Sequence, residues 1–320
     1  MFLLPCPELS QLKKFHISLI LTLFLVFTFG LVEFFKFDIA KHDFSEYESN
    51  IYLNIQVKLY EKHLAQLKNF KNSDQRFIAS ILEKSDMSDK KIVGSISRAS
   101  ILDSTFDPIT QSSLGLDPIA YQDWLSVHLQ MKESLNLSPS YLMGLNDIEY
   151  GFSRWVSYMF VHIGIYHLIS NCLFLLLFGA LIETLLGGVV VCLVFLGSGF
   201  LAAPIYMFLS GLNQASMVGA SGGVCGLVAF YSVYQIRHNM RFFYWVLPFD
   251  NYYGFTNLNS GLILVMWIAG DLAGYFSGVA FLDSVAYAAH LGGFLVGSMC
   301  ALGLILYDEI KSFRTAEIVK

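Results

Sequence analysis

The stretch that decides how this chain is interpreted is Gly219-Ala220-Ser221-Gly222-Gly223-Val224-Cys225-Gly226, at the start of an apolar segment. At the start of a helix, a serine has its hydroxyl and backbone N–H at the positive end of the helix dipole. Glycines beside it allow another helix, and a substrate backbone, to come close. Serine alone is a poor nucleophile and needs a base and an oxyanion site. The stretch therefore indicates either a nucleophilic serine or a helix-packing Gly222-x-x-x-Gly226 motif beside an incidental serine.

The composition indicates a polytopic membrane protein. Of the 320 residues, 55% are hydrophobic and only 14% are charged, and the mean hydropathy is +0.56. No soluble domain needs so much apolar surface. The net charge of −5 gives no basic footprint, so we expect no nucleic-acid partner. The five cysteines are scattered without C-x-x-C spacing, which indicates neither a disulfide framework nor a zinc site. We expect no metal.

Hydropathy along the chain predicts five segments. Residues 1–15 form a tail and 16–35 a first transmembrane helix, which is too long for a signal peptide and lacks a cleavage site. Residues 36–152 are polar, but apolar side chains recur in them at helical spacing, which predicts a small and mostly helical extramembrane insert. Residues 153–307 supply five further transmembrane helices, and residues 308–320 form a second tail. The predicted fold class is therefore an all-α polytopic membrane protein.

The distribution of Lys and Arg predicts the orientation of these six helices. In the last five we expect bounds near 162–185, 189–209, 221–236, 262–276 and 287–307. Lys13, Lys14, Arg237 and Arg241 then lie on one side with the basic second tail, whereas the loops 210–218 and 277–286 carry neither residue type. Because cytoplasmic loops carry the excess of Lys and Arg, we expect both termini in the cytoplasm. Ser221 and the insert then face outward.

The last apolar segment carries a histidine that matches Ser221 in depth. His290, Gly293 and Gly297 are spaced i, i+3 and i+7, so they share one helix face. Polar residues in membrane helices are costly and usually functional. Both helices begin at the outer side, so His290 and Ser221 can meet, and a neutral imidazole is the usual base for such a serine. Alone, His290 could instead be a packing histidine hydrogen-bonded to a neighbour.

The second apolar segment carries further polar residues. His167 and Asn171 are spaced i and i+4, so an imidazole N–H and an amide NH₂ point together and suit a developing oxyanion. The alternatives are metal ligation, which would need a third ligand and an HExxH-like context, and hydrogen bonding between helices. His162 lies at the start of the same segment. Glu183 lies between Gly179 and Gly187, and we expect it to accept hydrogen bonds from loop backbone.

Asp271, in the segment 262–276, is open to two interpretations. It could orient another group, or it could form a polar pair between helices.

Together these motifs resemble the rhomboid family of intramembrane serine proteases. The resemblance covers about residues 150–307, and its motifs run in the family's order. Each motif is weak alone, but the set is highly specific. The matching residues are Arg154, His162, His167, Asn171, Gly179, Glu183, Gly187, Gly219, Ser221, Gly222, His290, Gly293 and Gly297.

The resemblance implies a six-helix rhomboid bundle of bacterial type with a long first outer loop, located in a bacterial inner membrane. It implies Ser221 as nucleophile and His290 as base, with His167, Asn171 and the Ser221 N–H as the oxyanion hole. It also implies transmembrane protein substrates, cleaved within the lipid bilayer without a cofactor. Cys225 stands where bacterial relatives often have an aromatic residue that stacks on the histidine.

Other functions fit the sequence less well. A catalytically silent rhomboid-like protein that binds membrane clients is the main alternative, but such proteins usually lose the serine or the histidine. A transporter or channel predicts an internal repeat or paired broken helices, and the sequence has neither. An aspartyl intramembrane protease would need Asp271 and Asp308, but Asp308 falls at the inner membrane edge and the order is wrong.

Overall fold

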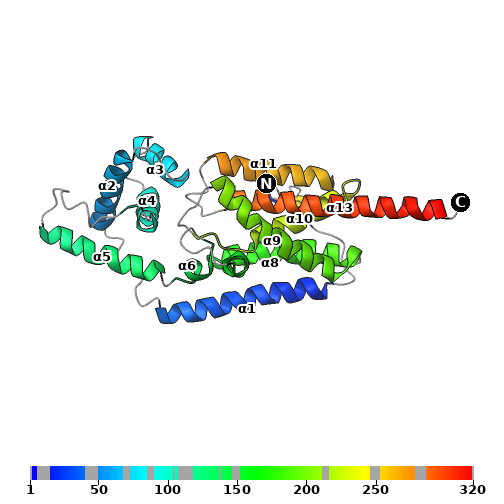
Figure 1. Ribbon diagram of the computed structural model, residues 1–320, viewed down its shortest axis with the longest axis horizontal. Helices are drawn as coiled ribbons and strands as arrows, with labels where there is room; N and C mark the ends of the chain where they lie inside the picture. Colours follow the sequence, from blue (N-terminus) through cyan, green and yellow to red (C-terminus); the bar gives the residue numbers. More distant parts are fainter. Residues whose placement is uncertain are drawn as a thin grey trace.

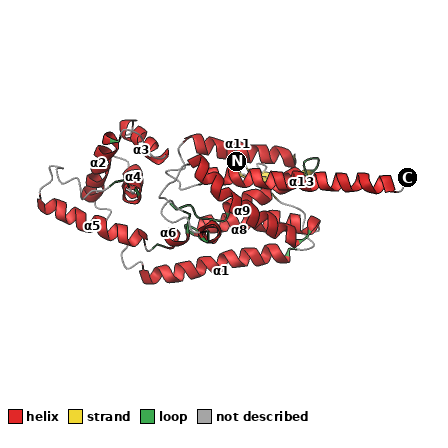
Figure 2. Cartoon of the chain, in the orientation of Figure 1, coloured by secondary structure: helices red, strands yellow, loops and turns green. Residues whose placement is uncertain are grey.

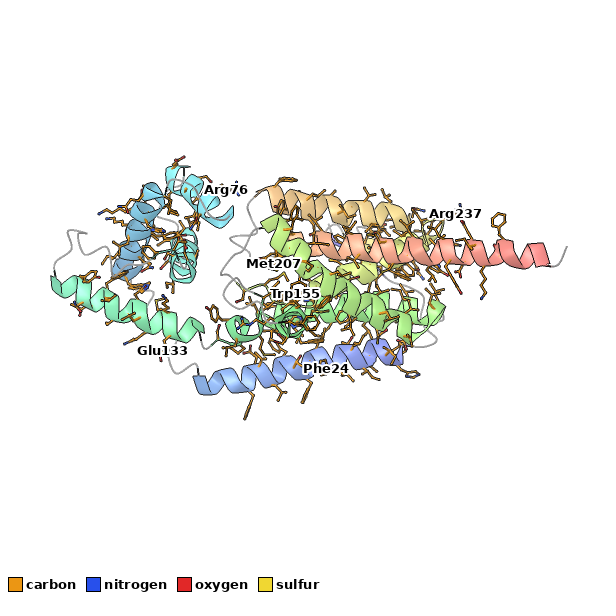
Figure 3. The ribbon with its side chains drawn as sticks, viewed as in Figure 1. Phe24, Arg76, Glu133, Trp155, Met207 and Arg237 are labelled. Carbon is orange, nitrogen blue, oxygen red and sulfur yellow. The ribbon has the colours of Figure 1, made fainter. Side chains whose placement is uncertain are left out.

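The computed structural model shows a mostly helical protein with one small sheet (Figure 2). Long apolar helices form one group, and shorter polar helices form a second group beside it (Figure 1). Figure 3 labels Phe24, Trp155 and Met207 in the first group, and Arg76 and Glu133 in the second. The structure describes residues 2–5, 15–39, 50–67, 73–84, 90–103, 105–106, 118–136, 138–145, 152–210, 216–245, 253–277 and 286–318.

The apolar group contains helices that are long enough to span a membrane. It contains α1 (His16–Ile39), α8 (Ile165–Leu186), α9 (Gly188–Ser210), α10 (Ser221–Tyr234), α11 (Ser260–Ser277) and α13 (Tyr287–Ile318). Among the described residues, α1, α8, α9 and α13 are long and apolar enough to cross a membrane, whereas α10 and α11 are shorter apolar helices. On α1, Phe27 and Phe34 are 61% and 74% exposed, which suits contact with lipid. The prediction of a membrane protein with several apolar spans is thus confirmed.

Helix α10 lies at the centre of this group, and its glycines explain why. Its residues from Gly222 to Phe230 are all buried, and it packs against α8, α9, α11 and α13. A side chain at Gly293 would collide with the carbonyl oxygen of Gly222, and one at Gly297 with that of Gly226. The two helices therefore touch backbone to backbone at two successive turns, as small residues permit.

Helix α1 is fixed to α8 through Glu183. The carboxylate of Glu183 accepts hydrogen bonds from the N–H groups of Ile17 and Ser18, at 3.0 and 2.9 Å, and from the Ser18 hydroxyl at 2.7 Å. An anion at this position compensates the positive end of the α1 dipole. Gly179 lets Ser18 approach, and Gly187, with a φ of 89°, turns the chain from α8 into α9.

The second group contains α2 (Asn50–Gln66), α3 (Ser73–Lys84), α4 (Lys90–Leu102), α5 (Pro118–Asn136) and the short α6 (Pro139–Met143). It has an apolar core of its own, which includes Tyr60, Ile78, Ile96 and Trp124. The sequence predicts a mostly helical insert here, and α2 to α5 supply its longer helices.

A small antiparallel sheet corrects the prediction that the chain is entirely α-helical. Strands β1 (Phe2–Pro5), β2 (Asn239–Trp245) and β3 (Tyr253–Asn259) pair in the order β1-β2-β3. Side-chain exposure alternates along β3, and the guanidinium of Arg241 lies 4.0 Å from the centre of the Phe255 ring. The sequence predicts a tail and a loop for these segments. It does not reveal their pairing, because β1 and its partner strand are more than 230 residues apart along the chain.

The sheet also joins two segments that the orientation argument places on one side. Strand β1 precedes α1, and β2 follows α10, so these two chain positions share one end of the apolar group. Lys13 and Lys14, and most of the loops 210–218 and 277–286, lie outside the described residues. Helix α13 continues to Ile318, so most of the expected tail 308–320 is helical and exposed where it is described. The cytoplasmic location of the termini stays a prediction.

Candidate active site

The turn before Ser221 is fixed by Gly219. Its φ of 117° lies in the region that favours glycine. A side chain there would also lie 2.6 Å from Cε1 of His167, so the His167 ring packs directly on this turn. The Gly219 N–H donates a hydrogen bond of 2.8 Å to the carbonyl of Tyr158. As a result Ser221 becomes the first residue of α10, and it is partly exposed while the residues after it are buried.

His162 supports the same turn from the other side. Its Nε2 accepts a hydrogen bond from the Ala220 N–H at 3.4 Å, and its side chain is 1% exposed. The rings of His162 and His167 meet edge to face, with their centres 5.2 Å apart. The structure thus brings both histidines to the Ser221 turn, with His162 in a supporting position.

Asn171 is buried with an unused hydrogen-bond donor. It lies on α8, one turn after His167, and is 4% exposed. Its Nδ2 has no hydrogen-bond partner among the residues that the structure describes. An unpaired buried amide is costly and calls for a functional or structural explanation.

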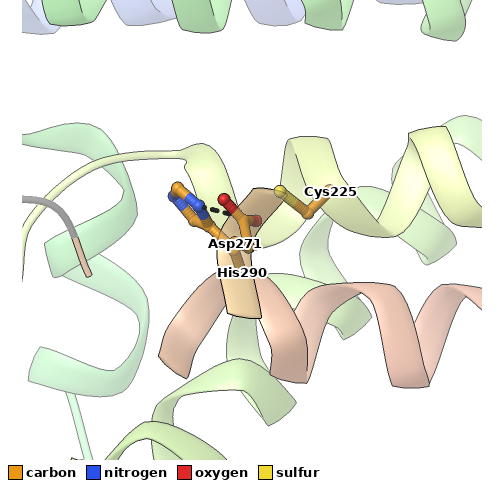
Figure 4. A group of neighbouring side chains, drawn as sticks. All are labelled: Cys225, Asp271 and His290. Carbon is orange, nitrogen blue, oxygen red and sulfur yellow. Dashed lines mark hydrogen bonds and ion pairs between the residues drawn. The ribbon is translucent and has the colours of Figure 1, made fainter. Parts of the chain in front are cut away.

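His290 lies in the first turn of α13 and contacts Asp271 of α11. Its Nδ1 is 3.2 Å from Oδ2 of Asp271, and the two side chains are 16% and 19% exposed (Figure 4). The ring of Tyr287 packs edge to face against the imidazole, with the centres 6.1 Å apart. The Asp271 contact supports the prediction that this residue pairs with a polar group, and identifies that group.

Ser221 and His290 lie at the same end of the α10–α13 helix pair. A Cβ atom at Gly222 would lie 3.6 Å from the carbonyl oxygen of Ala289. Ser221 precedes Gly222 and His290 follows Ala289, so both residues belong to this end of the helix pair. Within the described chain, Ser221 and His290 share no hydrogen bond. Catalytic hydrogen bonds are often long without a substrate and tighten in its presence.

Cys225 completes a group that could hold a metal ion. Its thiol sulfur points toward the Asp271 carboxylate (Figure 4). One ligand atom each from Cys225, Asp271 and His290 lie within 4.8 Å of one another. Sulfur, oxygen and nitrogen ligands of this kind suit zinc. The hydrogen bond between Asp271 and His290 already pairs two of the three groups, and the expectation of no metal stays a prediction.

Two residues other than the predicted nucleophile, base and oxyanion-hole donors stabilise the site. Arg154, at the start of α7 (Arg154–Ser157), donates hydrogen bonds to the carbonyls of Tyr141 at 2.8 Å and Gly144 at 3.4 Å. Arg154 thus ties the end of the second helix group to the apolar group. Tyr158, in the 3₁₀ turn η4 (Tyr158–Phe160), was not anticipated. Its hydroxyl donates to the Gly199 carbonyl at 2.6 Å, and its own carbonyl holds Gly219. No motif in the sequence marks it.

Comparison with known proteins points to one family. Residues 150–307 match the Rhomboid family, described as the Rhomboid domain. The mouse protein "Rhomboid-related protein 2" is 31% identical over 151 residues, which cover 45% of this chain and 45% of that protein. The Arabidopsis thaliana protein "RHOMBOID-like protein 2" is 34% identical over 154 residues, 48% of this chain and 42% of that protein. The match thus spans less than half the length of either relative. Both are eukaryotic, so the bacterial type and the inner-membrane location stay predictions.

Proposed function

The match over residues 150–307 makes this a rhomboid-family protein, and on that basis we propose that it is an intramembrane serine protease. It cleaves peptide bonds in or near the transmembrane helices of membrane-protein substrates. The observation that carries the proposal is the meeting of α10 and α13, which brings Ser221 and His290 to one end of a helix pair. We assign residues 153–307 to the catalytic core, and 36–152 to an extramembrane insert.

In this mechanism His290 acts as the general base. It accepts the hydroxyl proton of Ser221 while the serine Oγ bonds to the substrate carbonyl carbon. The imidazolium then gives that proton to the leaving amine as the C–N bond breaks, and an acyl-enzyme remains. A water molecule attacks the ester carbon and gives its proton to His290, which returns it to Ser221 as the acyl group leaves. The enzyme is regenerated without a cofactor.

The donors around Ser221 stabilise the negative oxygen of the tetrahedral intermediate. The Nδ2 of Asn171, a buried donor without a partner among the described residues, can bind it. The His167 ring packs on the turn that precedes Ser221, and the Ser221 N–H lies at the start of α10. Donors that are fixed before the reaction act strongly in a site of low polarity.

The substrate must unwind locally before attack, because the backbone of a membrane helix is hydrogen-bonded internally. With both termini on the cytoplasmic side, Ser221 lies toward the outer face. We therefore expect cleavage near the outer end of the substrate helix, and helix-weakening residues such as glycine should favour it.

The test uses proteoliposomes that contain the purified protein and a single-pass membrane protein with glycines near one end of its helix. We expect two fragments, with the cleavage site mapped by mass spectrometry to that end of the helix. Ser221→Ala should abolish cleavage. The matched control Ser232→Ala, which changes a buried serine of the same helix that is 1% exposed, should retain it. Binding of the substrate without cleavage by the folded wild type would favour the silent rhomboid-like alternative.

A further inference from the structure

Asp271 is the single charged side chain of α11, which is otherwise apolar. A carboxylate in a membrane helix is costly and is normally retained for a function. Its contacts show what that function could be, since Oδ2 lies 3.2 Å from Nδ1 of His290 on the neighbouring α13. The two residues are 19 positions apart in sequence and meet only because α11 packs against α13.

With an ionised Asp271, the contact between these two atoms selects one tautomer of His290. An ionised carboxylate has no proton to donate, so Nδ1 of the neutral imidazole must carry the hydrogen. Nε2 then holds the lone pair and is the nitrogen that can accept a proton. A ring held through one nitrogen also cannot rotate freely, which keeps the other nitrogen in place for its reaction.

The groups that face His290 leave Asp271 as its ionic partner. Cys225 comes from α10 and Tyr287 from α13 itself. Tyr287 offers a ring edge. The small Cys225 side chain, which is 6% exposed, leaves room for the Asp271 carboxylate beside the imidazole (Figure 4).

We propose that Asp271 is a positioning residue that orients His290 with Nε2 toward Ser221, so that the enzyme works with a Ser221–His290–Asp271 triad. The inference rests on the protease activity proposed above. When His290 takes the serine proton, Asp271 lies beside the resulting imidazolium and stabilises its charge without becoming protonated. Within the described part of the chain, the side-chain hydrogen bond of Asp271 is to His290, so Asp271 acts on the substrate through that residue.

The test compares Asp271→Asn with Asp271→Glu in the full-length protein. The amide can donate to Nδ1 and thereby favour the wrong tautomer, so we expect kcat of Asp271→Asn to fall by at least about 10-fold, toward the roughly 10⁴-fold loss that this change causes in a Ser-His-Asp triad. KM should change by less than about 2-fold, because the imidazolium forms only in the reaction. Asp271→Glu keeps the carboxylate and should recover part of the lost kcat. Asp308→Asn, which neutralises an exposed aspartate of α13, is the matched control and should leave both constants unchanged.

Labelling with a fluorophosphonate separates failure of this inference from failure of the proposed function. If the wild type and Ser221→Ala label equally, the serine-protease function itself is wrong. If Ser221→Ala loses labelling but Asp271→Asn labels and turns over like the wild type, only the role of Asp271 is overturned. A loss of kcat that follows a lower melting temperature, and is equal in Asp271→Asn and Asp271→Glu, would also overturn it, because a merely structural contact gives that pattern.

Discussion

The surroundings of Asn171 and Gly219, two residues near Ser221, indicate what each residue does. Asn171 has a buried donor without a partner among the described residues, and Gly219 has a backbone conformation and a neighbour that exclude a side chain. The positions of His167 and Asn171 one turn apart could be predicted from their spacing. The contact of His290 with Asp271 could not, because it depends on how two helices pack.

Asn171→Ala should lower turnover by about 100- to 1,000-fold, the usual effect of removing one oxyanion donor. KM should change little, because the bond to the oxygen strengthens only as charge develops. The melting temperature should also hold, since Nδ2 has no partner to lose in the described chain. Steady-state kinetics and a thermal shift in detergent measure both, with Cys172→Ala on the same helix as the control. An unstable but fully active variant would remove Asn171 from the site.

Gly219→Ala should inactivate and destabilise the protein. Alanine at a φ of 117° is strained by about 1–3 kcal/mol, and its Cβ would push against the His167 ring. Gly197→Ala is the matched control, because a Cβ at Gly197 meets nothing within 4 Å. We expect that control to be as active and as stable as the wild type in the same assays. Normal activity in Gly219→Ala would mean that the His167 ring can move without loss.

At the scale of elements, apolar runs in the sequence predict where the helices lie. They do not predict which elements contact one another. The starts of α10 and α13 lie where glycine spacing and hydropathy put them, at Ser221 and Tyr287. The sheet was not predicted, because β1 has only 4 residues and pairs with a segment far along the chain. Glu183, in the Gly179-x-x-x-Glu183 motif, was expected to accept hydrogen bonds from loop backbone. In the structure it accepts them from N–H groups at the start of α1.

Glu183→Gln should weaken the attachment of α1 without changing the chemistry. The amide keeps one acceptor oxygen but loses the charge that faces the start of α1, which should cost about 1–2 kcal/mol. We expect a lower melting temperature and a normal kcat for the folded fraction. Glu309→Gln, on the exposed part of α13, should leave the melting temperature unchanged. A large loss of kcat at an unchanged melting temperature would instead place Glu183 in the reaction.

At the scale of the whole molecule, the second helix group has a buried polar centre at Asp103. Its Oδ2 accepts from the Tyr60 hydroxyl at 2.7 Å and from Nε2 of Gln75 at 2.8 Å, and its Oδ1 accepts from Thr105. Burial opposes ionisation, but these hydrogen bonds outweigh it and lower the pKa of Asp103 below its usual value. Composition predicts a helical insert here, but not this centre, because the partners come from three separate segments.

The stability that Asp103 contributes should therefore depend on pH. A carboxyl whose pKa is lower in the folded state stabilises the fold above its unfolded pKa of about 3.9, and this stabilisation is lost as the pH falls through the folded pKa. We expect Asp103→Asn to cost at least about 1.5 kcal/mol at pH 7, and the difference from the wild type to shrink toward pH 3.

Urea unfolding followed by the fluorescence of Trp124 tests this pH dependence. Trp124 is 2% exposed in the same helix group, and the other tryptophans would be replaced by phenylalanine. The same replacements, with Asp103 intact, serve as the control. A difference between the two proteins that stays constant from pH 7 to pH 3 would contradict the role of the ionised carboxyl.

In the function proposed here, Ser221 is a nucleophile that is activated where α10 and α13 meet. The most direct test is labelling of the purified protein with a fluorophosphonate, followed by mass spectrometry of the modified peptide. We predict one phosphonylated residue, Ser221, with labelling lost in His290→Ala although that variant remains folded. Modification of another serine, or undiminished labelling of Ser221 in His290→Ala, would contradict the account.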